Sequence, residues 1–193
     1  MEAFSDGVFA IAITLLVLAI DPPNAGASLG SELLALWPSY LAYVMSFVVI
    51  GAIWINHHAM FRHIARSDSI LLILNLGQLL FIAFLPFPTD VLAGAFLSGV
   101  DESTATAFYG GTLAVLGVFV SLTWSYATRR PQLLDDRVSP EKARRLQRRY
   151  LVGPAGYAIG VMLGFVAPWL AVLVFIGLNA YFLWPQQRTN PSP

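Results

Sequence analysis

The chain has 193 residues, of which 57% are hydrophobic and 11% are charged, and its formal net charge at pH 7 is zero. Soluble domains carry about 25% charged residues, so this composition predicts a membrane protein. A net charge of zero provides no basic field for nucleic acid, and the absence of cysteine excludes disulfides, thiolate nucleophiles and cysteine-based metal sites.

The first apolar stretch, Phe4–Ile20, carries no charge after Asp6, and Pro22-Pro23 follow it and stop a helix. As an α-helix it would span about 25 Å, slightly less than the ~30 Å hydrocarbon core of a bilayer. A carboxylate at a membrane entrance is costly unless it is paired, so we expect Asp6 to face protein and the opposite stripe to be free. The free stripe contains Gly7, Ile11, Thr14, Leu15 and Leu18, and the other contains Asp6, Ala10, Ile13 and Val17.

A signal peptide is the alternative interpretation of this stretch, because Ala25-Gly26-Ala27 has the form of a small-residue cleavage site. Signal peptides begin with a basic region, whereas this segment begins with Glu2 and Asp6. The acidic start therefore favours a retained helix.

Five further apolar segments follow and predict an all-α, polytopic membrane protein with six transmembrane helices. We expect them at residues 33–55, 68–87, 105–127, 150–166 and 169–184, with connections at 21–31, 56–67, 89–104 and 128–149. We expect one domain, with residues 1–187 forming the six-helix membrane unit and residues 188–193 forming a disordered tail.

Two local patterns refine the fifth segment. Ser139-Pro140-Glu141 has the form of an N-cap, a first-turn proline and a first-turn acid, so a basic helix should begin there and continue into the segment. Gly156, Gly160 and Gly164 repeat every four residues and predict a face that packs closely against another helix.

The basic residues predict the orientation, with both termini cytoplasmic. If the N-terminus is inside, every Lys and Arg falls in an inner loop or the tail, as the positive-inside rule requires. The outer loops then hold only the acids Asp21, Glu32, Asp90, Asp101 and Glu102. The eleven basic residues are Arg62, Arg66, Arg129, Arg130, Arg137, Lys142, Arg144, Arg145, Arg148, Arg149 and Arg188.

This topology puts Asp6, His57 and His58 at the same depth, with Asn75 somewhat deeper. Asp6 could therefore pair with a histidine or asparagine of the second or third segment. The alternative is that Asp6 only caps its own helix in contact with water. His63 has no comparable partner, and we expect it to be a solvated loop residue.

Metal and enzyme sites are less favoured. A metal site could be imagined from His57, His58 and His63, but adjacent histidines on a helix diverge by about 100°, so His57 and His58 cannot easily share one ion within a subunit. No nucleophile-elbow, zinc-protease or phosphate-loop motif supports catalysis, and we expect neither an enzyme nor a cofactor. The basic stretch 129–149 could contact anionic lipid heads, although fixing the topology is its simpler role.

The first helix also carries a family signature. Phe4-Ser5-Asp6, followed by Ala10, Thr14-Leu15-Leu16 and Leu18, resembles the first-helix motif of the transmembrane protein 175 family of potassium channels. In that family an Arg stands four residues before the Phe, a position that here would precede Met1. Trp54, His57-His58 and Asn75-Leu76 also match family positions.

The resemblance implies a bacterial, single-repeat homotetramer in the cell's inner membrane, with the first helix lining a pore for potassium ions. It places the narrow constriction at Ile11, a polar layer at Thr14, and Leu15 and Leu18 on the same pore-facing stripe. It further implies that the Ser5–Asp6 pair takes part in a structural hydrogen-bond network with His57, His58 and Asn75.

A channel of this kind would not share the fold of the tetrameric channels with a TVGYG filter, because no such sequence occurs, and its side chains would have to select the ion. One rival is a proton-coupled secondary transporter that uses Asp6 and a histidine. Against it, Asp6 lies at the end of its span and no inverted repeat is visible. A non-conducting membrane scaffold is the other alternative.

Overall fold

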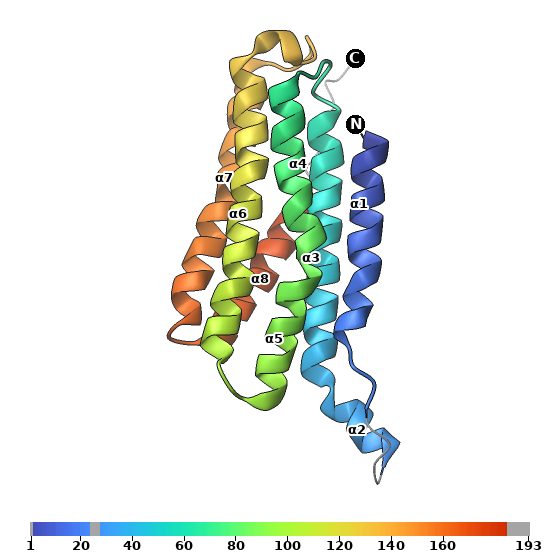
Figure 1. Cartoon of the computed structure of the whole chain (residues 1–193). Helices are drawn as coiled ribbons and strands as arrows, with labels where there is room; N and C mark the ends of the chain where they lie inside the picture. Colours follow the sequence, from blue (N-terminus) through green and yellow to red (C-terminus); the bar gives the residue numbers. More distant parts are fainter. Residues whose placement is uncertain (1, 24–27, 185–193) are drawn as a thin grey trace.

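The computed structural model describes residues 2–23 and 28–184, and the chain is helical through most of this range (Figure 1). The only strand-like element among these residues is an isolated bridge between Ile64 and Leu134. The prediction of an all-α membrane protein is confirmed at this level. The elements are α1 (Glu2–Leu15), η1 (Leu16–Ala19), α2 (Leu29–Ala35), α3 (Trp37–Phe61), α4 (Ser69–Phe84), α5 (Pro86–Ser98), α6 (Glu102–Arg129), η2 (Pro131–Leu133), α7 (Pro140–Gly164) and α8 (Pro168–Leu183).

The first helix differs from the expected one in its ending and in its buried face. The α-helix ends at Leu15, and the chain continues as the 3₁₀ turn η1 before Ile20 becomes extended. The buried face consists of Ser5, Phe9, Ala12 and Leu16. The buried stripe is therefore displaced by one residue from the stripe that was expected to face protein. Asp6 lies at the edge of the buried stripe and is half-exposed.

The second and third expected segments both have wrong boundaries. α3 continues six residues past the expected end at Ile55, so His57 and His58 lie on a helix and not in a connection. The region 89–104, expected to be a loop, is mostly the helix α5, because Pro86 stands in its first turn, where proline is tolerated. The true connection is short and turns at Gly99 and Asp101, which both have positive φ.

The start of α7 is confirmed. The Ser139 side chain accepts a hydrogen bond from the backbone N–H of Lys142 at 3.2 Å, and the helix runs without interruption from Pro140 to Gly164. Two glycines of the repeat lie where α7 contacts a neighbouring helix. A Cβ atom on Gly160 would be 2.3 Å from the Phe175 ring of α8, and one on Gly164 would be 3.1 Å from Thr106 of α6. These glycines let α7 approach both neighbours closely, as predicted.

The helices form an elongated bundle in which α1 packs on α3 and α4, while α7 packs on α6 and α8 (Figure 1). Within the described ranges, four segments are long and apolar enough to cross a membrane: Glu2–Ala19, Trp37–Phe61, Ser69–Ser98 and Glu102–Arg129. α8 is a shorter apolar helix, and α7 begins with a basic half. The tail expected at 188–193 lies outside the described residues.

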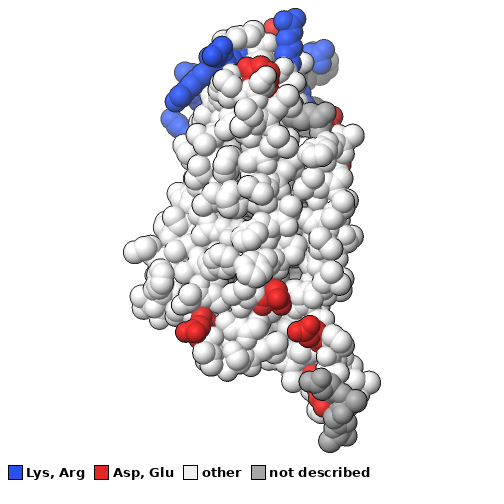
Figure 2. Space-filling view, in the orientation of Figure 1, with Lys and Arg blue, Asp and Glu red and all other residues white. Residues whose placement is uncertain are grey.

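Charged side chains gather at the two ends of the bundle and leave a wide uncharged belt between them (Figure 2). The Lys and Arg side chains in this view lie at the end formed by η2 and the start of α7, whereas acidic side chains are seen at both ends, and the opposite end shows only acids (Figures 1 and 2). This distribution is the one that a protein embedded in a bilayer requires.

Candidate functional site

The helix α1 exposes an apolar stripe on the surface of the single chain. Ile11 is 62% exposed and Leu18 is 73% exposed, and Phe4 and Leu15 are exposed beside them. Thr14 lies on the same stripe and is also exposed. All four residues that the sequence placed on the free stripe as pore candidates, Ile11, Thr14, Leu15 and Leu18, therefore face away from their own subunit.

The Thr14 hydroxyl has a fixed partner within the helix. It donates its proton to the carbonyl oxygen of Ile11 at 2.8 Å. Because a hydroxyl has one proton and two acceptor lone pairs, this bond leaves the Thr14 oxygen able to accept. The group can therefore offer an oxygen to a cation or to the water around it.

A buried hydrogen-bond chain attaches the opposite face of α1 to α3 and α4. The side-chain amide of Asn75 donates to the Ser5 hydroxyl at 3.1 Å, and its oxygen lies 2.8 Å from Nε2 of His57. Because that oxygen can only accept, Nε2 of His57 must carry the proton. All three residues are buried, and the rings of Phe9 and Phe61 pack against the His57 imidazole.

Asp6 has a different partner from the one expected. Its Oδ1 accepts a hydrogen bond from the Trp54 indole at 2.8 Å. Among the described residues, the Asp6 carboxylate makes no hydrogen bond to His57, His58 or Asn75. Trp54 lies on α3 one turn before His58, whose exposed imidazole is tilted against the indole at 6.1 Å between ring centroids. Asp6 is thus adjacent to the chain of Ser5, Asn75 and His57 and separate from it.

His63 is not the freely solvated residue expected from sequence. It is half-buried, and its ring meets the edge of Trp124 at 6.3 Å between centroids. Burial lowers the pKa of His63 below its ordinary value, and nearby Lys142 and Arg62 lower it further. Among the residues that the structure describes, no three His, Asp or Glu side chains form a cluster that could hold a metal ion.

Two residues at this end of the bundle have roles that were not predicted. Trp54 matches a family position, but its hydrogen bond to Asp6 was not expected, although an indole N–H at the depth of a carboxylate is a ready donor. Gln78 was not among the candidate site residues, and it is a fully buried side chain.

Comparison with known proteins gives a consistent result. A family model described as the endosomal/lysosomal potassium channel TMEM175 matches residues 1–86. A potassium channel of Streptomyces collinus is 41% identical over 184 residues, which cover 94% of this chain and 89% of that protein. The endosomal/lysosomal proton channel TMEM175 of Gallus gallus is 45% identical over 96 residues, or 45% of this chain and 19% of that protein.

A solved structure extends the similarity to the fold. The crystal structure of a lysosomal potassium-selective channel TMEM175 homolog from Chamaesiphon minutus matches with a TM-score of 0.84 and 37% sequence identity. The match covers 94% of this chain and 93% of that chain.

Proposed function

We propose, from the premise that this chain belongs to the TMEM175 potassium channel family, that it conducts potassium ions passively through a pore lined by α1. The observation that carries the proposal is the stripe of Ile11, Thr14, Leu15 and Leu18, which is exposed on the single chain although it belongs to an apolar helix. A stripe of this kind needs either lipid or further subunits to cover it.

The proposed assembly is a homotetramer in a bacterial inner membrane, with four copies of α1 around the axis. Six spans per subunit would consist of α1, α3, the α4–α5 pair, α6, α7 and α8. The segregation of charge supports this count with both termini cytoplasmic, because the basic end of the bundle would then face the cytoplasm (Figure 2). Residues 1–187 would form one channel unit.

The proposed constriction is a ring of Ile11 side chains. Such a ring offers no ligand oxygen, so an ion must pass with part of its water shell removed or compressed. Sodium holds its water more strongly than potassium, so a narrow apolar ring penalises sodium more. Selectivity of this kind should be moderate, because no oxygen cage replaces the lost water as carbonyls do in other potassium filters. A slightly tighter ring would dewet, so that filter and gate coincide.

The proposed roles of the other site residues follow from their positions. Thr14 gives a polar layer one turn beyond Ile11, with an oxygen free to accept, while Leu15 and Leu18 continue the apolar lining. Ser5, Asn75 and His57 hold the helix in position from behind. Asp6 accepts a hydrogen bond from Trp54 at the edge of the contact between α1 and α3, and the His58 ring lies beside Trp54.

The experiment measures ion flux in liposomes that contain only the purified protein. A passive channel dissipates a potassium gradient without coupling, a secondary transporter couples it to another ion, and a scaffold conducts nothing. Because the Gallus gallus relative is named a proton channel, the same liposomes should also be tested with a proton gradient.

The test of the site compares Ile11→Ala with Ile73→Ala. Ile73 lies on α4 and is 64% exposed, against 62% for Ile11, so the two substitutions remove the same atoms from equally exposed positions. We expect Ile11→Ala to raise conductance and reduce potassium over sodium discrimination, and Ile73→Ala to leave both unchanged. Unchanged reversal potentials in Ile11→Ala under bi-ionic gradients would place the pore elsewhere.

A further inference from the structure

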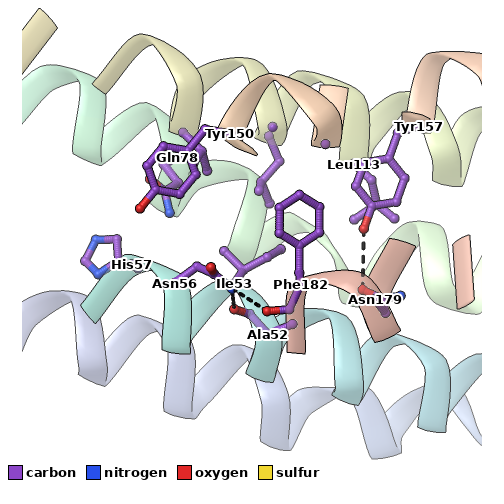
Figure 3. Close-up of a pocket in the computed structure, with 14 residues that line it drawn as sticks. Ala52, Ile53, Asn56, His57, Gln78, Leu113, Tyr150, Tyr157, Asn179 and Phe182 are labelled. Carbon is purple, nitrogen blue, oxygen red and sulfur yellow. Dashed lines mark hydrogen bonds between the residues drawn. The ribbon is translucent and has the colours of Figure 1, made fainter. Parts of the chain in front are cut away.

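A second site lies inside the subunit, away from the exposed stripe of α1. It is a cavity of about 50 Å³ between α3, α4, α6, α7 and α8 (Figure 3). Most of the wall is apolar, but six polar side chains also line it. They are Asn56, His57, Gln78, Tyr150, Tyr157 and Asn179.

One wall residue has a polar atom without a protein partner. Gln78 is 1% exposed, and its Oε1 accepts no hydrogen bond within the described ranges. A buried carbonyl without a partner is unfavourable, so native proteins satisfy such groups with protein or with ordered water.

Other hydrogen-bonding groups line the same cavity. Figure 3 shows Gln78 and Tyr150 toward one end of the cavity and Tyr157 and Asn179 toward the other, and all four line its wall. The Tyr150 hydroxyl makes no hydrogen bond to described residues, and that of Tyr157 reaches Asn179 only at 3.4 Å, long for an O–H···O bond. The cavity thus offers a water molecule the two to four polar partners that it needs.

We propose that this cavity binds ordered water, and that the water joins Gln78 Oε1 to the tyrosine hydroxyls of α7. Each water needs roughly 10–15 Å³ of such space, so about three to five can be held. The volume is too small for a larger ligand, since binding one benzene takes a cavity of roughly 150 Å³.

The water site would extend the hydrogen-bond chain that attaches α1. Asn75 and Gln78 share a face of α4, with Asn75 directed at Ser5 and Gln78 at the cavity. On α3, His57 bonds to Asn75 and also lines the cavity. Bound water would therefore couple α7 to α3 and α4, the two helices whose side chains hold Ser5. The proposed water site does not depend on which ion the pore conducts.

The first test is hydroxyl-radical footprinting by X-ray pulses on the purified protein. Radicals formed from internal water modify the side chains beside it, so Tyr150 and Tyr157 should be labelled although both are buried. Tyr109 is the matched control, because it is fully buried, its hydroxyl bonds to Ser46, and it is not among the residues that line this cavity. Labelling of Tyr150 and Tyr157 no higher than that of Tyr109 would overturn the proposal.

A cavity-filling variant sharpens this test. Gly153 lines the cavity, and an added methyl group would lie 3.4 Å from Phe182, an ordinary contact, so Gly153→Ala should fold. We expect it to reduce labelling of Tyr150 at least twofold. Gly94→Ala, where a methyl group meets nothing within 4 Å, should leave the labelling unchanged. If Gly153→Ala does not fold, the comparison of the wild-type tyrosines decides alone.

The second test is the direction of the stability change in Gln78→Leu. If water satisfies Gln78, the substitution removes a partner of that water and lowers the unfolding temperature, by about 2–4 °C for a change of this kind. If the cavity is dry, leucine removes an unsatisfied amide and the unfolding temperature rises. A rise would overturn the assignment of Gln78 as the water-binding residue.

Discussion

At the scale of single residues, Asn75 joins three helices through the two ends of one amide. Its nitrogen donates to Ser5 of α1 and its oxygen accepts from His57 of α3, while its own backbone belongs to α4. Asparagine suits this position because a short amide presents a donor and an acceptor in one plane. A serine or an aspartate could supply only part of this pairing.

We predict that Asn75→Leu lowers stability strongly. The substitution leaves the Ser5 hydroxyl and the His57 N–H buried without partners, at about 1–3 kcal/mol each. Thermal unfolding of the purified protein measures the effect. Ser5→Ala added to Asn75→Leu should lower stability by less than the sum of the two single changes, because both act on one chain of bonds. Strict additivity would show that Ser5 and Asn75 are not coupled.

At the scale of elements, the break between α4 and α5 is held by a buried relay of hydroxyl groups. Pro86 and Pro88 lack backbone donors at the break, and the two helices together form an apolar segment of 30 residues. Thr89 donates to the Leu85 carbonyl at 2.9 Å, and Ser46 Oγ lies 2.8 Å from Thr89 and 2.9 Å from the Tyr109 hydroxyl.

The direction of this relay follows from the number of protons. Thr89 uses its only proton on the Leu85 carbonyl, so it must accept from Ser46. Ser46 then has no proton left and must accept from Tyr109. The relay therefore runs from α6 through α3 to the break, where it ends at the backbone carbonyl of Leu85.

This direction predicts that Ser46→Ala is more destabilising than Tyr109→Phe. Alanine at position 46 leaves the fully buried Tyr109 hydroxyl unsatisfied, at about 1–3 kcal/mol. Phenylalanine at position 109 removes the first donor and leaves the remaining bonds intact, at about 0.5–1 kcal/mol. Chemical or thermal unfolding of both variants checks the order. The reverse order would mean that the protons are arranged differently.

At the scale of the whole molecule, the segregation of charge determines how the bundle can lie in a membrane. The end formed by η2 and the start of α7 carries the basic side chains, and the turn between α5 and α6 lies at the other end (Figures 1 and 2). Moving the basic end across a bilayer would require many charges to be transferred at once. A single orientation is therefore expected, and each subunit of an assembly would share it.

The orientation can be tested with single cysteines, because the chain contains none of its own. Val100 is 60% exposed in the turn between α5 and α6, and the Arg137 side chain is 94% exposed near the start of α7. We predict that Val100→Cys reacts with an impermeant thiol reagent in intact cells and that Arg137→Cys reacts only after permeabilisation. The opposite pattern would invert the proposed topology.

The sequence alone determined the class of the protein, the exposed stripe of α1 and the helix start at Ser139. These features follow from composition, from periodicity and from local capping, which depend on residues near one another in the chain. The tertiary structure decided how each helix is rotated about its own axis, because that angle is set by the helices packed against it. For this reason the tertiary structure placed Ser5 and not Asp6 against Asn75, paired Asp6 with Trp54, and brought Gln78 into the wall of a cavity.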